Sequence, residues 1–257
     1  MRTPNDVEGL TGLLSSAGFV AAEEEALQLL DRAAGDAARL ELFVGRRLNG
    51  EPLAHITGGV TFCGLDIRVD PGVYVPRWQS EALARRAVER LPQDGLAVEL
   101  CAGSGAIATV LASERPDARI VATDIDEDAI ACARANGVDA RRGDLFAPLP
   151  GGLQGHVDVV VGVVPYVPTR ELRLLQRDTF TFESPLSYNG GPDGTDVLRR
   201  AVSDSARFLR RGGALLLELG GRQADLLRPD LERAGYANVG VLSDEDGDVR
   251  GIEATLA

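Results

Sequence analysis

The segment VELCAGSGAIA, residues 98–108, decides the fold of this chain. It begins with apolar residues typical of a buried strand, passes through Gly103-Ser104-Gly105, and continues as an alanine-rich run typical of a helix. Glycines allow a tight turn and a close approach of a ligand to the backbone. The helix that follows offers free N–H groups at its N-terminus. The segment therefore predicts a strand–loop–helix unit that can hold a polar ligand.

Strand-like and helix-like segments alternate after this loop. We expect strands at 97–101, 119–125, 157–164 and 214–220, and helices at 106–114, 126–136, 195–209 and 222–235. Such alternation predicts a parallel sheet with helices on both faces. The last two strand-like segments, 237–242 and 249–256, are joined by SDEDGD, which is too short for a crossover helix. These two strands should therefore be antiparallel.

Composition limits the classes of partner. The 257-residue chain has a formal net charge of −12, so it is a poor partner for phosphate backbones and we expect no nucleic-acid partner. We expect neither a signal peptide nor a membrane span, because the N-terminus lacks a basic stretch followed by an apolar one and no apolar run reaches the roughly 20 residues that a span needs. The three cysteines have no metal-type spacing. We expect a cytoplasmic protein without a bound metal, and the sequence leaves the oligomeric state open.

An acid follows the glycine loop at the end of the next strand. Asp124 lies where a carboxylate can accept both ribose hydroxyls of a nucleoside. Gly103, Gly105 and Ala108 also fit the G-x-G-x-x-G/A pattern of dinucleotide sites, so a nicotinamide or flavin cofactor is an alternative. A glycine turn without any ligand is the other alternative.

Three later features favour S-adenosyl-L-methionine as the cofactor. Asp144 follows a third strand, where an acid can reach an adenine amino group. The fourth strand ends in Pro165-Tyr166, and the sheet closes with the antiparallel pair. We therefore predict S-adenosyl-L-methionine rather than a dinucleotide.

At these residues the chain resembles the release-factor glutamine methyltransferases of the HemK/PrmC type. Residues 51–83, EPLAHITGGVTFCGLDIRVDPGVYVPRWQSEAL, look like the segment that joins that family's helical N-terminal domain to its catalytic domain. Residues 181–202, TFESPLSYNGGPDGTDVLRRAV, look like the segment after its catalytic motif. The resemblance covers nearly the whole chain.

The resemblance implies a class I S-adenosylmethionine-dependent methyltransferase fold, a mostly parallel seven-stranded sheet with a C-terminal antiparallel pair. It implies a small helical N-terminal domain at 1–50, a linker with a β-hairpin at 51–75, and the catalytic domain at 76–257. The implied cofactor residues lie in the glycine loop and at the following strand ends: Glu99, Cys101, Ala102, Gly103, Ser104, Gly105, Asp124, Ile125, Asp144, Leu145 and Val163.

The family's catalytic motif is altered here. Asn-Pro-Pro-Tyr is replaced by Val163, Val164, Pro165 and Tyr166. In the family, the asparagine side chain and a following backbone carbonyl accept hydrogen bonds from the substrate's amide nitrogen, which positions it for transfer. Valine has no acceptor, so we expect a divergent methyltransferase acting on another substrate, such as a small molecule of specialised metabolism. A release-factor glutamine methyltransferase and a non-catalytic cofactor-binding interaction protein are the alternatives.

The resemblance and the altered motif indicate candidate site residues. The candidate catalytic residues are Tyr166, Pro165, Val164 and Glu183, and the candidate substrate-binding residues are Val163, Tyr166, Trp78, Arg77 and His55. Tyr166 follows the carboxyl end of a strand, where open α/β sheets bind ligands. Glu183 and His55 are candidate bases, with a loop cap as the alternative role for Glu183. Trp78 is a substrate wall or a packing residue, and Arg77 is a substrate contact or half of an ion pair.

Overall fold

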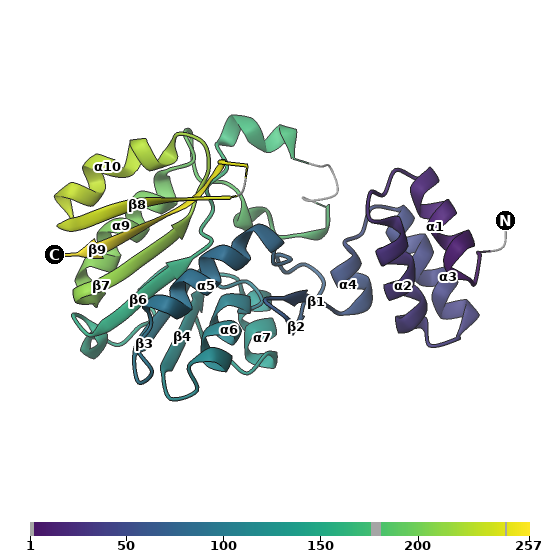
Figure 1. The fold of residues 1–257 in the computed structure, drawn as a ribbon, viewed down its shortest axis with the longest axis horizontal. Helices are drawn as coiled ribbons and strands as arrows, with labels where there is room; N and C mark the ends of the chain where they lie inside the picture. The colour runs from purple at the N-terminus through teal and green to yellow at the C-terminus, as the bar shows by residue number, and fades with distance from the viewer. Residues whose placement is uncertain (1–2, 176–180, 245) are drawn as a thin grey trace.

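The computed structural model describes residues 3–175, 181–244 and 246–257. Its centre is a seven-stranded sheet with the order β5-β4-β3-β6-β7-β9-β8 (Figure 1). Its strands are β3 (Leu96–Leu100), β4 (Arg119–Asp124), β5 (Asp139–Arg142), β6 (Val157–Gly162), β7 (Leu209–Glu218), β8 (Tyr236–Ser243) and β9 (Val249–Leu256). The strands from β5 to β7 pair in parallel, and β9 pairs antiparallel with both β7 and β8. The predicted class I methyltransferase fold is confirmed.

Helices cover both faces of the sheet (Figure 1). They are α5 (Glu81–Arg90), α6 (Ala106–Glu114), α7 (Glu127–Ala135), α9 (Asp196–Phe208) and α10 (Gln223–Arg233). Strand β7 shows how the sequence builds two cores, because successive strand side chains point to opposite faces. Leu215 and Leu217 join the core that contains α9 and α10, whereas Ala214 and Leu216 join the core that contains α5 and α6.

Three helices precede this domain and have a core of their own. Helices α1 (Val7–Ser16), α2 (Ala22–Ala33) and α3 (Ala37–Leu48) pack through an apolar cluster that includes Leu14, Leu29 and Leu40. They lie to one side of the sheet, at the far end of the molecule from the C-terminus (Figure 1). The same cluster also contains Ile56, beyond residue 50, and the domain boundary at residue 50 stays a prediction.

A short helix and a hairpin connect the two parts. These are α4 (Leu53–Thr57) and the strands β1 (Gly59–Phe62) and β2 (Leu65–Arg68), which pair antiparallel as predicted. Phe62 and Ile67 of the hairpin are each 1% exposed and pack into the core beneath α5 and α6. The hairpin, which lies in the predicted linker at 51–75, therefore packs against the sheet domain.

The segment after β6 is more ordered than the sequence predicts. No periodic strand or helix pattern marks residues 165–194. The described part nevertheless includes the 3-10 helices η3 (Thr169–Leu174) and η4 (Pro185–Ser187). Two isolated bridges, Gly72 with Glu183 and Val167 with Asn189, tie it to its neighbours. The remaining 3-10 helices are η1 (Trp78–Ser80) and η2 (Gly151–Leu153).

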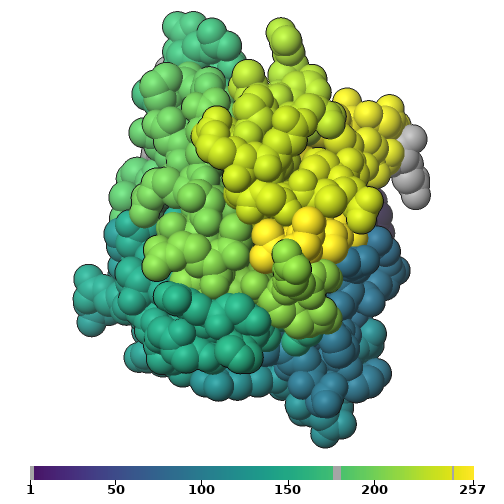
Figure 2. Space-filling model, turned by 90° about the vertical axis from the view of Figure 1, so that its left-hand side faces the viewer, coloured from purple at the N-terminus to yellow at the C-terminus, as the bar shows by residue number. Residues whose placement is uncertain are grey.

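The side of the molecule opposite the N-terminal helices is covered largely by the C-terminal elements. Figure 2 shows α10, β8 and β9 in yellow-green and yellow over the upper part of this face. Across the described ranges, no helix combines the length and apolar character required to cross a membrane. The cytoplasmic location stays a prediction.

Candidate active site

The glycine loop connects β3 to α6 through residues in left-handed backbone conformations. The φ angles are +52° at Cys101, +54° at Gly103 and +74° at Gly105. A Cβ atom on Gly105 would lie 3.0 Å from Ala133 Cβ and 3.1 Å from Val138 Cγ2, so packing also requires glycine there. A Cβ atom on Gly103 would meet nothing closer than Tyr74, at 3.8 Å. Gly103 therefore keeps an open space above the backbone, and Gly105 lets the loop pack on α7 and β5.

Glu99 fixes the start of α6 from beneath. Its Oε2 accepts a hydrogen bond of 2.9 Å from the backbone N–H of Ala108, which belongs to the first turn of α6. The side chain is almost fully buried, and this burial raises the pKa of Glu99 to about 8. A buried carboxyl at a helix N-terminus stabilises N–H groups that would otherwise lack partners.

Asp124 ties the end of β4 to the same loop. Its Oδ2 accepts from the backbone N–H of Gly103 at 2.9 Å, and its Oδ1 accepts from the N–H of Asp126 at 2.9 Å. Partial burial raises the pKa of this carboxyl. Each carboxylate oxygen retains a further acceptor position, so Asp124 can also receive hydrogen bonds from a ligand.

These residues surround a cavity of about 830 Å3, hereafter the cofactor cavity. Of the predicted cofactor residues, its lining includes Glu99, Cys101, Ala102, Gly103, Ser104, Asp124, Ile125 and Val163. Ser104 is 1% exposed, and within the described residues its hydroxyl has no hydrogen-bond partner.

The cavity fits the chemistry of S-adenosyl-L-methionine. Asp124 would accept the ribose hydroxyls, and the open backbone at Gly103 would lie along the ligand. The carboxyl groups of Asp124 and Asp126 in the lining suit a ligand with a sulfonium and an ammonium group. The exposed side chain of Ile125 offers an apolar surface at the same edge.

Three predicted cofactor residues lie outside this lining. Gly105 lies behind the loop, against α7. The Asp144 carboxylate accepts a 2.5 Å hydrogen bond from Arg200, and Leu145 is buried in the core with a φ of +46°. A role for Asp144 and Leu145 at the adenine ring stays a prediction.

The altered motif lies where β6 ends, at the edge of the cofactor cavity. Val163 and Pro165 line that cavity, whereas Val164 is 1% exposed and packs into the core. Tyr166 points the other way, into a second cavity of about 660 Å3, hereafter the second cavity. Tyr74 lines both cavities, so they adjoin at this ring.

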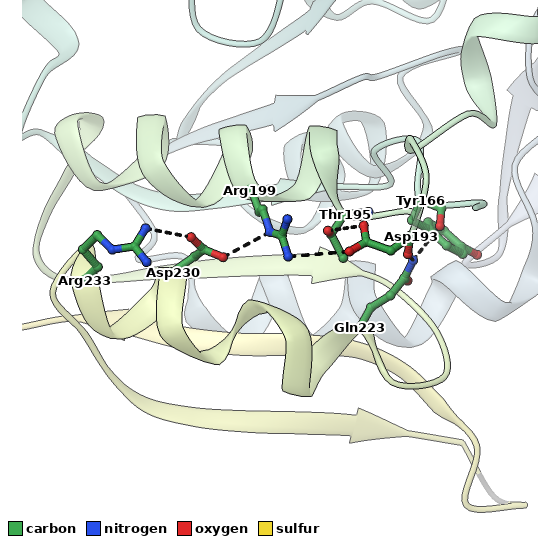
Figure 3. A network of polar contacts seen from close by, with 7 residues as sticks. All are labelled: Tyr166, Asp193, Thr195, Arg199, Gln223, Asp230 and Arg233. Atoms are coloured by element: carbon green, nitrogen blue, oxygen red, sulfur yellow. Dashed lines mark hydrogen bonds and ion pairs between the residues drawn. The ribbon is translucent and has the colours of Figure 1, made fainter. Parts of the chain in front are cut away.

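Two residues that the sequence analysis missed hold Tyr166. Its hydroxyl donates to Glu218 Oε1 at 3.0 Å, and its main-chain carbonyl accepts from Gln223 Nε2 at 2.6 Å (Figure 3). Glu218 is 5% exposed, and its Oε2 accepts from the Ser80 hydroxyl at 2.5 Å. Burial raises the pKa of Glu218. The signal for Glu218 was present, since it is a single charged residue at the carboxyl end of the apolar run ALLLEL.

The remaining candidates lie farther from the cofactor cavity. Glu183 is buried and accepts bonds of 2.8 and 3.0 Å from Arg77 and a further bond from the Tyr188 hydroxyl. Its carboxylate is thus occupied by an ion pair, while Arg77 also lines the second cavity. His55 is buried with Nε2 2.9 Å from the Val73 carbonyl, and Trp78 is 71% exposed. Neither lines the cofactor cavity or the second cavity, and their roles in catalysis or substrate binding stay predictions.

Curated relatives match most of the chain. It is 36% identical over 210 residues to the release factor glutamine methyltransferase of Geobacter sulfurreducens, covering 79% of this chain and 73% of that protein. It is 40% identical over 223 residues to that of Moorella thermoacetica, covering 82% and 77%. The Escherichia coli protein of the same name is 33% identical over 80% of this chain and 76% of its own length.

This chain belongs to the release factor glutamine methyltransferase family. The model of the methyltransferase small domain also matches residues 65–147, which include the glycine loop and Asp124. A methyltransferase from Pyrococcus furiosus superposes with a TM-score of 0.54 at 18% identity, covering 83% of this chain and 97% of that one. That structure shows the shared fold. This member of the family is an S-adenosylmethionine-dependent methyltransferase.

Proposed function

We propose that this enzyme methylates the side-chain amide nitrogen of a glutamine in a protein, and that a peptide chain release factor is its substrate. The observation that carries this proposal is the extent of similarity to the named relatives, 33–40% identity over about 80% of the chain. It replaces the expectation of a small-molecule substrate as the leading hypothesis. A non-catalytic role is not retained, because the family is enzymatic.

The arrangement of the two cavities supports this proposal. The cofactor supplies an electrophilic methyl group, and the chain must hold a nitrogen in line with it. Pro165 lies at the cofactor cavity, Tyr166 lies at the second cavity, and Tyr74 lies at both. On this proposal the reacting amide would lie at the cofactor cavity, and the rest of a peptide would occupy the second cavity. Arg77 and Arg250 line that cavity and offer donors to peptide carbonyls.

Val163 favours a second candidate function. Its side chain lines the cofactor cavity at the position where the family's motif has asparagine, and it offers no hydrogen-bond acceptor. An amide N–H facing it unpaired would cost about 1–3 kcal/mol. A substrate with an apolar or aromatic group near the reacting atom would pack better there. The second candidate is therefore methylation of such a small molecule.

A labelling experiment separates the two functions. The purified enzyme would be incubated with methyl-labelled S-adenosyl-L-methionine and a bacterial release factor that carries the Gly-Gly-Gln motif. We expect label on the glutamine, located by peptide mass spectrometry, and none on a release factor whose motif glutamine is changed to asparagine. Calorimetry with S-adenosylhomocysteine would verify that the enzyme binds its cofactor product. Cofactor binding without any release-factor labelling would reject the proposal and favour the small-molecule candidate.

A further inference from the structure

Glu218 differs from the other buried carboxyl groups of the described residues. Three glutamates are buried there, Glu99, Glu183 and Glu218. Glu99 holds the start of α6, and Glu183 is paired with an arginine. Among the described residues, the side chain of Glu218 accepts hydrogen bonds only from the hydroxyl groups of Ser80 and Tyr166, and it lines the second cavity. A desolvated carboxyl at a cavity wall is a candidate functional group.

Its two hydrogen bonds fix the direction of the Tyr166 hydroxyl proton. An ionised carboxylate only accepts hydrogen bonds, so the phenol must donate its single proton to Glu218 Oε1. The lone pairs of the phenol oxygen then remain available to a donor from the second cavity. Ser80 occupies the other carboxylate oxygen and prevents the group from turning away.

This geometry places a hydrogen-bond acceptor in the second cavity. Val163 offers no acceptor at the cofactor cavity, whereas a phenol oxygen whose proton is already committed can accept a hydrogen bond from a substrate group in the second cavity. We propose that Glu218 is a positioning residue that fixes the Tyr166 hydroxyl as a hydrogen-bond acceptor, for an N–H or O–H group of the substrate. The proposal rests on the proposed function at one point, because there the substrate donor is a glutamine amide N–H.

The charged and titratable groups around this pair are few. Tyr74, Arg77 and Arg250 line the same cavity as Glu218 and Tyr166. Burial has the largest effect on Glu218 and raises its pKa. The positive charge of the Arg250 guanidinium acts over a longer range and lowers this pKa by less. Protonation of Glu218 at low pH would remove the constraint on the phenol proton. The acceptor function should therefore be lost as the pH falls.

Activity measurements test the proposal first. With a release factor as substrate, we expect Glu218→Met and Tyr166→Phe each to lower kcat by about 100-fold, with cofactor affinity changed less than about threefold. Methionine has no oxygen that can accept the phenol proton. Glu253→Met is the matched control. Glu253 lies on the neighbouring strand β9 and pairs with Arg86, outside the lining of both cavities, so this variant should keep its kcat. Wild-type kcat in Glu218→Met would overturn the proposal.

A measurement without substrate keeps the inference separate from the proposed function. The four tyrosines would be labelled with 3-fluorotyrosine and followed by fluorine NMR across a pH series. We expect the Tyr166 signal to titrate with Glu218 in the wild type and to be pH-independent over that range in Glu218→Gln. Tyr236, which donates to the Val202 carbonyl, provides the internal reference. An identical Tyr166 titration in both proteins would overturn the inference, whatever the release-factor result. If the Tyr166 signal titrates with Glu218 but the enzyme does not methylate the release factor, only the proposed glutamine substrate is rejected.

Discussion

The side-chain nitrogen of Gln223 lies 2.6 Å from the main-chain oxygen of Tyr166 (Figure 3). Gln223 begins α10, and its Oε1 also accepts from the backbone N–H of Gly220 at 3.1 Å. The glycine segment around Gly194 closes over this bond, because a Cβ there would lie 2.2 Å from the Tyr166 oxygen and 2.3 Å from Gln223 Nε2. The main chain of Tyr166 is therefore held by α10 while its side chain is held by β7.

Replacing Gln223 should weaken both stability and turnover. Gln223→Met keeps the length of the side chain but leaves the buried Tyr166 carbonyl without this donor, which costs about 1–3 kcal/mol. Urea unfolding should show this loss, and kcat should fall because Tyr166 is less well placed. Gln28→Met, an exposed change on α2, is the control and should leave both quantities unchanged. Equal urea midpoints for the two variants would contradict the expectation.

The two loop glycines should respond differently to alanine. Both have positive φ, which costs a residue with a Cβ about 1–2 kcal/mol. Gly105→Ala adds contacts of 3.0 and 3.1 Å, so its thermal midpoint should be the lower of the two. Gly103→Ala adds no close protein contact but fills the cofactor cavity, so it should mainly weaken binding of S-adenosylhomocysteine. Melting curves and calorimetry on both variants check this contrast. A lower thermal midpoint for Gly103→Ala, or weaker binding of S-adenosylhomocysteine by Gly105→Ala, would contradict it.

Asp124 should be the main polar anchor of the ribose. Asp124→Ala removes hydrogen bonds to a charged group, each worth about 1.5–3 kcal/mol, so affinity for S-adenosylhomocysteine should fall at least about tenfold. Asp128→Ala changes an exposed carboxyl on α7 and should leave the affinity within about twofold. Calorimetry of the two variants checks this contrast. Equal affinities would place the ribose elsewhere.

The role of Asp144 can be separated from its ion pair. Asp144→Ala and Arg200→Ala both break the 2.5 Å contact between these residues. If Asp144 also binds the adenine amino group, only Asp144→Ala loses that additional bond. We therefore expect Asp144→Ala to weaken the binding of S-adenosylhomocysteine more than Arg200→Ala. Equal losses in calorimetry would leave Asp144 with a structural role alone.

Glu99 should make the stability of the ligand-free enzyme depend on pH. Burial raises its pKa from the ordinary 4.5 to about 8. Between these values the folded chain keeps a proton that the unfolded chain releases, so the free energy of unfolding contributed by Glu99 falls as the pH rises. The difference in unfolding free energy between wild type and Glu99→Gln should therefore shrink from about pH 5 to pH 8. A difference that is constant across this range would refute the raised pKa.

Local patterns in the sequence were enough to predict the sheet and the cofactor loop. The run from Val98 to Ala108 combines a strand, two glycines and a helix start, and Asp124 follows at the end of the next strand. These features depend on periodicity and on backbone freedom, which neighbouring residues determine. The closing antiparallel pair followed from a connection too short for a helix.

Only the tertiary structure decided how the second cavity is built. Ser80 comes from a 3-10 helix, Tyr166 from the segment after β6, Glu218 from the end of β7, and Gln223 from the start of α10. No periodic pattern links them, because each hydrogen bond joins segments that only the sheet order brings together. His55 is bonded to the Val73 carbonyl and Trp78 lies at the surface, and neither placement follows from the sequence pattern. The sequence thus determined the strand, loop and acid that line the cofactor cavity, whereas long-range packing decided which side chains line the second cavity, since burial and hydrogen bonding between distant segments exist only in the folded chain.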